Sequence, residues 1–276
     1  MDSNKKLHKD NFLYTALKGL IVGASMLVPG VSGGSMAMIL GIYGKLVRAV
    51  SSFFKDILGN VLFLGTFVLG AGIGMILFAS PLGKLTENYN MIMMYFFMGA
   101  VAGGIPLIYK SSKVKKITAK EIFYIFIGAL ITLLINFIPE GIFDFGGGLT
   151  LASLGMLALG GIVIAVALIL PGISVSYMLL VLGMYTETMN AIKSLYFPYL
   201  IPLALGVLLG VVLTTRILET TMNRYPEKTY LIILGFIIGS VVMVFPGLPA
   251  GMELLICPIM FLLGFIIIKK ISSFQA

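Results

Sequence analysis

Long apolar segments separated by short polar loops run through the whole chain. Most of them approach the roughly 20 residues that a helix needs to cross a bilayer. Two are shorter, with about 13 to 14 residues, a length that favours a re-entrant or broken helix over a full crossing. The ten segments are 12–28, 31–44, 57–80, 91–109, 121–138, 150–170, 173–185, 197–215, 229–246 and 253–268.

A polar, glycine-rich break precedes each of the two short segments. Proline ends a helix, glycine lets the backbone turn sharply, and serine is a favourable first cap of the next helix. In the first break we expect that helix to begin near Met36. Its free N–H groups and positive dipole end suit an anion such as a phosphate. The breaks read Pro29-Gly30-Val31-Ser32-Gly33-Gly34-Ser35 and Pro171-Gly172-Ile173-Ser174-Val175-Ser176.

The second break repeats the first at a constant offset of 142 residues. Interrupted helices at corresponding positions of two halves indicate the binding site of a transporter. The alternative is that both breaks are tight turns between membrane helices, with serines that satisfy local backbone groups. The matching positions are Pro29, Gly30, Ser32, Met36, Leu40, Gly41 and Tyr43 with Pro171, Gly172, Ser174, Met178, Leu182, Gly183 and Tyr185. The predicted binding residues in the breaks are Pro29, Gly30, Ser32, Gly33, Gly34, Ser35, Pro171, Gly172, Ser174 and Ser176.

The composition identifies the class of protein. The chain has 276 residues, of which 59% are apolar and 11% charged, and its mean hydropathy is +1.08. A soluble domain of this length could not bury so much apolar surface, so we expect an all-α polytopic membrane protein. The net charge is +8, but the charges do not cluster on a polar domain, which argues against a nucleic-acid partner. With only Cys257 and His8, we expect no disulfide, no metal site and no cofactor.

The basic residues predict the orientation of the chain in the membrane. One arrangement places 17 of the 19 lysines and arginines, and both termini, in the cytoplasm, and leaves Lys84 and Lys193 outside. Lysines before the first segment resemble the start of a signal peptide, but that segment runs directly into the first break, so we expect it to be retained. The cytoplasmic groups are Lys5, Lys6, Lys9 and Lys18; Lys45, Arg48 and Lys55; Lys110, Lys113, Lys115, Lys116 and Lys120; Arg216, Arg224 and Lys228; Lys269 and Lys270.

This orientation predicts an inverted-topology repeat. Residues 1–140 form one half, whose hairpin enters from the cytoplasmic side, and residues 141–276 form the other, whose hairpin enters from the outer side. Each half is a hairpin plus three crossings. Re-entrant hairpins and pairs of full, broken helices both return to their starting side; the short segments favour the first. Further glycines match between the halves: Gly70 loosely with Gly210, and Gly99 and Gly103 with Gly235 and Gly239.

Few charged or polar side chains outside the breaks are candidates for function. Arg48 and Arg216 could each supply a fixed cation for a phosphate, or anchor a helix end at the membrane surface. Glu187 is a candidate proton carrier, with a solvated loop residue as the alternative. Tyr43 and Tyr185 either line a cavity or belong to an interfacial belt, and we favour the belt.

The repeated breaks, each followed by a Leu-Gly-x-Tyr sequence, resemble the DUF368 family over essentially the whole chain. The resemblance implies a transporter of the bacterial cytoplasmic membrane for polyprenyl phosphate, such as undecaprenyl phosphate. Such a transporter returns the lipid carrier from the outer to the inner leaflet after cell-wall polymers such as peptidoglycan are exported. Val175 stands where the second break of the family would have a glycine.

Two alternatives remain. Membrane-embedded undecaprenyl-diphosphate phosphatases also use repeated Pro-Gly-x-Ser loops, but with an arginine where this chain has Gly33 and Val175, and with a glutamate-rich motif that is missing here. Because the groups for acid–base chemistry are absent, we expect no enzyme. The other alternative is a channel or a secondary transporter of small solutes or anions, which also use broken helices. The sequence predicts neither a coupling ion nor an oligomeric state.

Overall fold

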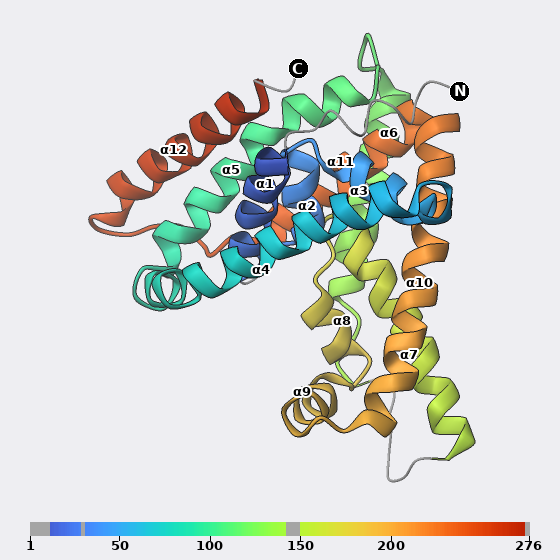
Figure 1. The fold of residues 1–276 in the computed structure, drawn as a ribbon. Coiled ribbons are helices and arrows are strands. Elements are labelled where there is room, and N and C mark those ends of the chain that lie inside the picture. Colours follow the sequence, from blue (N-terminus) through green and yellow to red (C-terminus); the bar gives the residue numbers. More distant parts are fainter. Residues whose placement is uncertain (1–11, 29–30, 142–149, 274–276) are drawn as a thin grey trace.

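The computed structural model describes residues 12–28, 31–141 and 150–273, and within these ranges the chain is helical, without β-strands (Figure 1). The helices are α1 (Phe12–Ser25), α2 (Gly33–Ile39), α3 (Tyr43–Ser51), the 3-10 helix η2 (Phe53–Lys55), α4 (Ile57–Asn88), α5 (Asn90–Ser111), α6 (Ala119–Asn136), α7 (Leu151–Ile169), α8 (Val175–Val181), α9 (Tyr185–Ser194), α10 (Phe197–Arg224), α11 (Pro226–Val244) and α12 (Glu253–Ser273).

In the described part of the chain, six helices are long and apolar enough to cross a membrane: α4, α5, α7, α10, α11 and α12. Their outer faces carry large exposed apolar side chains, such as Leu69 (70% exposed) and Ile76 (80%), as expected where a helix faces lipid. The chain is therefore a multi-pass membrane protein. Five of these helices match expected crossings, and the sixth does not. Helix α7, assigned above to a hairpin, is one of the six, whereas α6, which covers most of the expected crossing 121–138, is not among them over its described residues.

Each break is followed by two short helices, α2 and α3 in the first half and α8 and α9 in the second, so the helix after each break is a broken one. Helix α2 begins at Gly33, three residues before the expected start, with Ser32 as its N-cap. Gly41 and Gly183 end α2 and α8 with positive φ angles of 64° and 67°, which glycine adopts readily. The same two backbone hydrogen bonds close the helix end at each glycine. In the first half, Gly41 N donates to Met38 O and Ile42 N donates to Ala37 O. In the second half, Gly183 N donates to Leu180 O and Met184 N donates to Leu179 O.

The two halves contain the same series of helices, and the helices pair in equivalent ways. Helix α1 packs on α4 as α7 packs on α10, while α5 packs on α12 and α6 on α11, so these last pairs join different halves. Glycines allow the close approach. A Cβ at Gly99 would lie 1.9 Å from Phe261 O, and one at Gly235 would lie 2.1 Å from Ile125 O. The predicted match of Gly99 with Gly235 is therefore confirmed at the level of packing.

The loose match of Gly70 with Gly210 is wrong. Gly70 contacts the carbonyl oxygen of Ala16, and the glycine that contacts the equivalent residue, Ala158, is Gly206. The offset between the halves thus falls from 142 at the breaks to 136 in α4 and α10. The cause is a stretch of six additional residues in the first half between Tyr43 and Gly70, in the region that contains η2.

Candidate functional site

A cavity of about 790 Å³ lies between the two halves, and both breaks line it. The first half contributes residues of α1, α2, α3 and α4, and the second half contributes residues of α7, α8 and α10. The structure therefore brings together two segments that are 142 residues apart in the sequence. From the breaks themselves, the lining residues are Val31, Ser32, Gly33, Gly34, Ile173, Ser174, Val175 and Ser176.

The two breaks touch at one wall of this cavity. A Cβ added to Gly34 would lie 3.3 Å from Pro171 Cα and 3.4 Å from Ile169 O. Such distances are near the lower limit of van der Waals contact. The absence of a side chain at Gly34 therefore allows the backbones of the two breaks to approach one another.

Three hydroxyl groups on the cavity wall differ in their bonding. Ser174 Oγ accepts a hydrogen bond from Tyr177 N at 3.4 Å and so caps α8. Ser32 holds the equivalent position on α2, is half-buried, and forms no hydrogen bond with the described residues. The Tyr43 hydroxyl donates to Ile169 O at 2.7 Å. Of these three hydroxyl groups, that of Ser32 is the one that no described residue engages.

The rest of the cavity wall is mainly apolar and continues to the outer surface of the protein. Helix α4 contributes Phe67 and Val68, and α7 contributes Leu168. Val68 is 63% exposed and Leu168 39% exposed, so these side chains belong both to the cavity and to the surface that faces lipid. The arrangement fits a ligand with a small polar head and a long apolar tail, because polar groups in such a site fix orientation while apolar walls provide contact area.

Four of the predicted binding residues in the breaks are not observed at the wall. Pro29 and Gly30 lie outside the described residues. Pro171 and Gly172 are buried beneath the wall, where a Cβ on Gly172 (φ 89°) would lie 2.4 Å from Phe236 O. A fifth, Ser35, is 3% exposed and does not line the cavity; its Oγ has no hydrogen-bond partner among the described residues.

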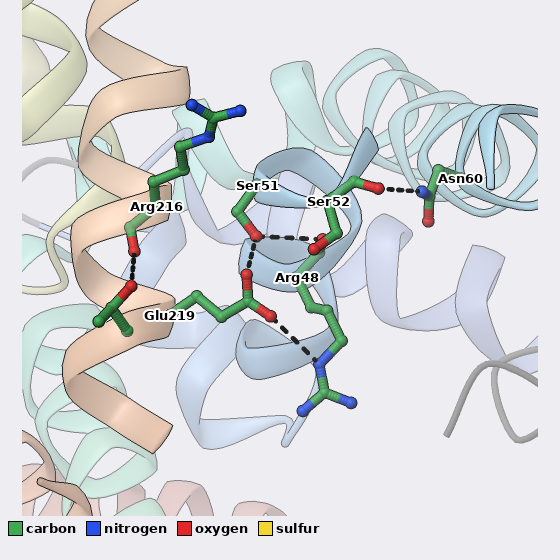
Figure 2. A network of polar contacts seen from close by, with 7 residues as sticks. Arg48, Ser51, Ser52, Asn60, Arg216 and Glu219 are labelled. Atoms are coloured by element: carbon green, nitrogen blue, oxygen red, sulfur yellow. Dashed lines mark hydrogen bonds and ion pairs between the residues drawn. The ribbon is translucent and has the colours of Figure 1, made fainter. Parts of the chain in front are cut away.

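The charged candidates also lie away from the cavity wall. Arg48 Nε is 3.8 Å from Glu219 Oε1, and Ser51 donates a hydrogen bond to the other oxygen of this carboxylate (Figure 2). The Arg216 side chain points away from this group in the same view, and both Arg216 and Glu187 are exposed. Among the described residues, no set of three or more His, Cys, Asp or Glu side chains is arranged to hold a metal ion.

Some lining residues were misread or missed in the sequence. For Tyr43 the favoured interpretation, an interfacial belt, is wrong and the alternative is confirmed, because Tyr43 is 4% exposed and lines the cavity. Thr215 on α10 and Phe67 on α4 carried no sequence signal, because they lie in ordinary apolar helices whose position depends on tertiary packing. For Tyr43 a signal existed, since it is the last matching position of the repeated breaks.

The chain resembles known proteins over most of its length. Residues 22–252 match the family described as undecaprenyl phosphate translocase-like. A polyprenyl-phosphate transporter of Staphylococcus aureus (strain NCTC 8325 / PS 47) is 32% identical over 271 residues, which cover 94% of this chain and 96% of the relative. A polyprenyl-phosphate transporter of Vibrio cholerae serotype O1 (strain ATCC 39315 / El Tor Inaba N16961) is 28% identical, covering 86% of this chain and 78% of the relative. No solved structure matches the chain significantly. From its repeated breaks and from these matches, the chain belongs to the undecaprenyl phosphate translocase-like family.

Proposed function

We propose that this protein transports polyprenyl phosphate across the bacterial cytoplasmic membrane, from the outer to the inner leaflet, for reuse in cell-wall polymer synthesis. The observation that carries the proposal is the single cavity lined by both breaks, which joins a few hydroxyl groups to an apolar wall open to lipid. The names of the two relatives support the same substrate class. No chemical step is part of this function.

The two ends of the ligand have opposite requirements. A bare phosphate that enters the membrane loses its hydration, at a penalty of at least several kcal/mol. We place the phosphate beside Ser32, Ser174 and Ser176, where hydroxyl and backbone N–H donors replace water. The prenyl tail leaves the cavity past Val68 and Leu168 and remains in lipid.

Positive charge for the phosphate comes from outside the cavity in this proposal. Arg48 and Arg216 directly follow Val47 and Thr215, two residues that line the cavity. We assign both arginines to the path of the headgroup on the α3 side. Glu187, at the start of α9, is the matching candidate for proton transfer on the other side.

The proposed topology is an inverted repeat with both termini in the cytoplasm. The equivalent pairing of α1 with α4 and of α7 with α10 supports a repeat, and the distribution of basic residues supports the inversion. We propose that the two breaks, with α2 and α8, enter the membrane from opposite sides. Non-helical backbone at that depth is tolerated because it is buried in protein or lines a polar cavity.

The test uses purified protein in sealed liposomes that contain a polyprenyl phosphate. The fraction of headgroups accessible from outside is followed over time. We expect fast equilibration with the protein, and loss of most of this acceleration in the double variant Ser32→Ala/Ser174→Ala. The matched control is Ser80→Ala, which removes the hydroxyl of an exposed serine on α4 that does not line the cavity.

Three outcomes would contradict the proposal. Equilibration no faster than in empty liposomes would argue for a transporter of small solutes or anions. Full activity of the double serine variant would place the headgroup elsewhere. Release of inorganic phosphate from a polyprenyl diphosphate at enzymatic rates would indicate a phosphatase.

A further inference from the structure

Tyr43 and Tyr185 hold equivalent positions in the two halves but have different environments. Tyr43, at the start of α3, is 4% exposed, and its hydroxyl donates a hydrogen bond to Ile169 O at the end of α7, in the other half. Tyr185, at the start of α9, is 37% exposed and forms no hydrogen bond with the described residues. The residue equivalent to Ile169 is Leu27, two residues after the end of α1.

The helices that begin with the two tyrosines, α3 and α9, also differ in how they pack. Helix α3 packs on α10, where Arg48 and Ser51 contact Glu219 (Figure 2). The equivalent packing would be α9 on α4, but α9 packs on α8 and α10 and lies well apart from α4 (Figure 1). One side of the cavity is therefore closed by contacts between the halves, and the equivalent contacts on the other side are not made.

The exposure of the lining residues agrees with this asymmetry. The cavity residues on α3 include Tyr43 and Val47, both less than 5% exposed. Toward α4 and α8, the cavity residues include Val68, which is 63% exposed, and Ser176, also exposed. The cavity is thus closed toward α3 and open toward α4 and α8.

We infer that Tyr43 and Tyr185 are the two gate residues of the transporter and that they close in alternation. In the present structure the Tyr43 gate is closed. In the alternative state the Tyr43–Ile169 hydrogen bond breaks, α3 leaves α10, α9 packs on α4, and the Tyr185 hydroxyl donates to Leu27 O. This inference rests on the proposed inverted repeat, in which equivalent contacts face opposite sides of the membrane. With the termini in the cytoplasm, the structure represents the state that is open to the outside.

Cysteine cross-linking measures the two gates separately from transport. A Cβ at Gly44 on α3 would lie 3.7 Å from Met222 Cε on α10, so the pair Gly44→Cys/Met222→Cys reports the closed Tyr43 gate. The equivalent pair, Thr186→Cys/Thr86→Cys, reports the closed Tyr185 gate. Both pairs are made on a Cys257→Ala background and treated with a short bifunctional thiol reagent, with and without polyprenyl phosphate.

Tyr43→Phe and Tyr185→Phe shift the two gates in opposite directions. Loss of one hydrogen bond present in only one state changes the ratio of the states by about fivefold. In Tyr43→Phe, the ratio of cross-linking at the Thr86/Thr186 pair to that at the Gly44/Met222 pair rises by about this factor. In Tyr185→Phe it falls by a similar factor. Tyr89→Phe, at an exposed tyrosine between α4 and α5, leaves the ratio unchanged.

The cross-linking results test the gates, and the liposome assay tests the proposed function. A ratio that does not change, or that changes in the same direction in both gate variants, overturns the inference, as does a Thr86/Thr186 pair that never cross-links. If the gates exchange as described but the protein does not accelerate the equilibration of polyprenyl phosphate, the inference stands and the proposed substrate is wrong. Elution of each variant as a single species in size-exclusion chromatography shows that the substitutions leave the fold intact.

Discussion

The two halves of this chain share one framework of paired helices, but their breaks lie in different surroundings. The glycine contacts of α5 with α12 have close equivalents in those of α11 with α6. At the breaks, by contrast, Tyr43 is buried and bonded while Tyr185 is exposed, and Ser32 lacks the capping bond that Ser174 makes. The framework is symmetric because its contacts are set by helix surfaces that match in both halves. The asymmetry is concentrated around the cavity, where the proposed exchange of gates requires it.

The largest expected effect comes from a change to the symmetric framework. Gly99→Ala and Gly235→Ala each place a methyl group about 2 Å from a backbone oxygen of the partner helix. Since backbone cannot move aside as a side chain can, each substitution should lower the free energy of unfolding by about 1–3 kcal/mol. Thermal unfolding of the purified protein in detergent, followed by size-exclusion chromatography, measures the effect.

The control for these variants is Gly72→Ala. No atom lies within 4 Å of a Cβ at Gly72, so its melting temperature should match that of the unchanged protein. If Gly99→Ala and Gly235→Ala differed strongly from each other, the framework would not be symmetric.

A smaller effect is expected from the contact that only the first half makes. Glu219→Gln removes the charge that faces Arg48 and weakens the hydrogen bond from Ser51. Since Arg48 is about half exposed, the pair contributes at most about 1 kcal/mol. Cross-linking of the Gly44/Met222 pair should fall by about two- to fivefold, and less in high salt, where exposed charges are screened.

Glu87→Gln is the control for the Glu219 variant. Glu87 is an exposed carboxylate near the end of α4, without an ion pair to a described residue. It should leave cross-linking at both pairs unchanged. An equal effect of the two substitutions would mean that net charge, and not the contact with α3, determines the gate.

The smallest effect sharpens the comparison of the two breaks. Ser174→Ala removes the cap of α8 and should lower the free energy of unfolding by about 0.5 kcal/mol, since the bond is long. Ser32→Ala removes no hydrogen bond within the protein and should leave stability unchanged while it slows polyprenyl phosphate transport. Thermal unfolding and the liposome assay on both single variants separate these roles. A loss of stability in Ser32→Ala would show that its hydroxyl is used inside the fold.

The sequence predicted the elements of the site better than their arrangement. Ser32 was correctly predicted as a helix cap, because a serine after a Pro-Gly pair marks a helix start from local chemistry alone. Ser35, the other predicted cap, lies inside α2, which begins at Gly33. Arg48 was predicted as a candidate for the phosphate, and the structure pairs it with Glu219, a residue 171 positions away. That pairing left no trace in the local sequence.

The alignment of the halves shows where sequence comparison loses accuracy. The match of Gly99 with Gly235 was predicted correctly, but that of Gly70 with Gly210 was not, since the first half has six additional residues between Tyr43 and Gly70. An insertion of a few residues between two apolar helices hardly changes the composition of the chain. The helix contacts reveal it, because Gly70 and Gly206 face equivalent carbonyl groups.

The sequence by itself determined the class of protein, the two breaks and their repetition. These depend on the apolar length of each segment and on Pro, Gly and Ser residues that act on neighbouring backbone, as Gly41 and Gly183 do at the ends of α2 and α8. Only the tertiary structure decided that α5 pairs with α12, that both breaks line one cavity, and that Tyr43 is bonded while Tyr185 is not. The reason is physical: these features are contacts between distant residues, such as Tyr43 and Ile169, 126 positions apart. Similar local sequences make such a contact in one half and not in the other.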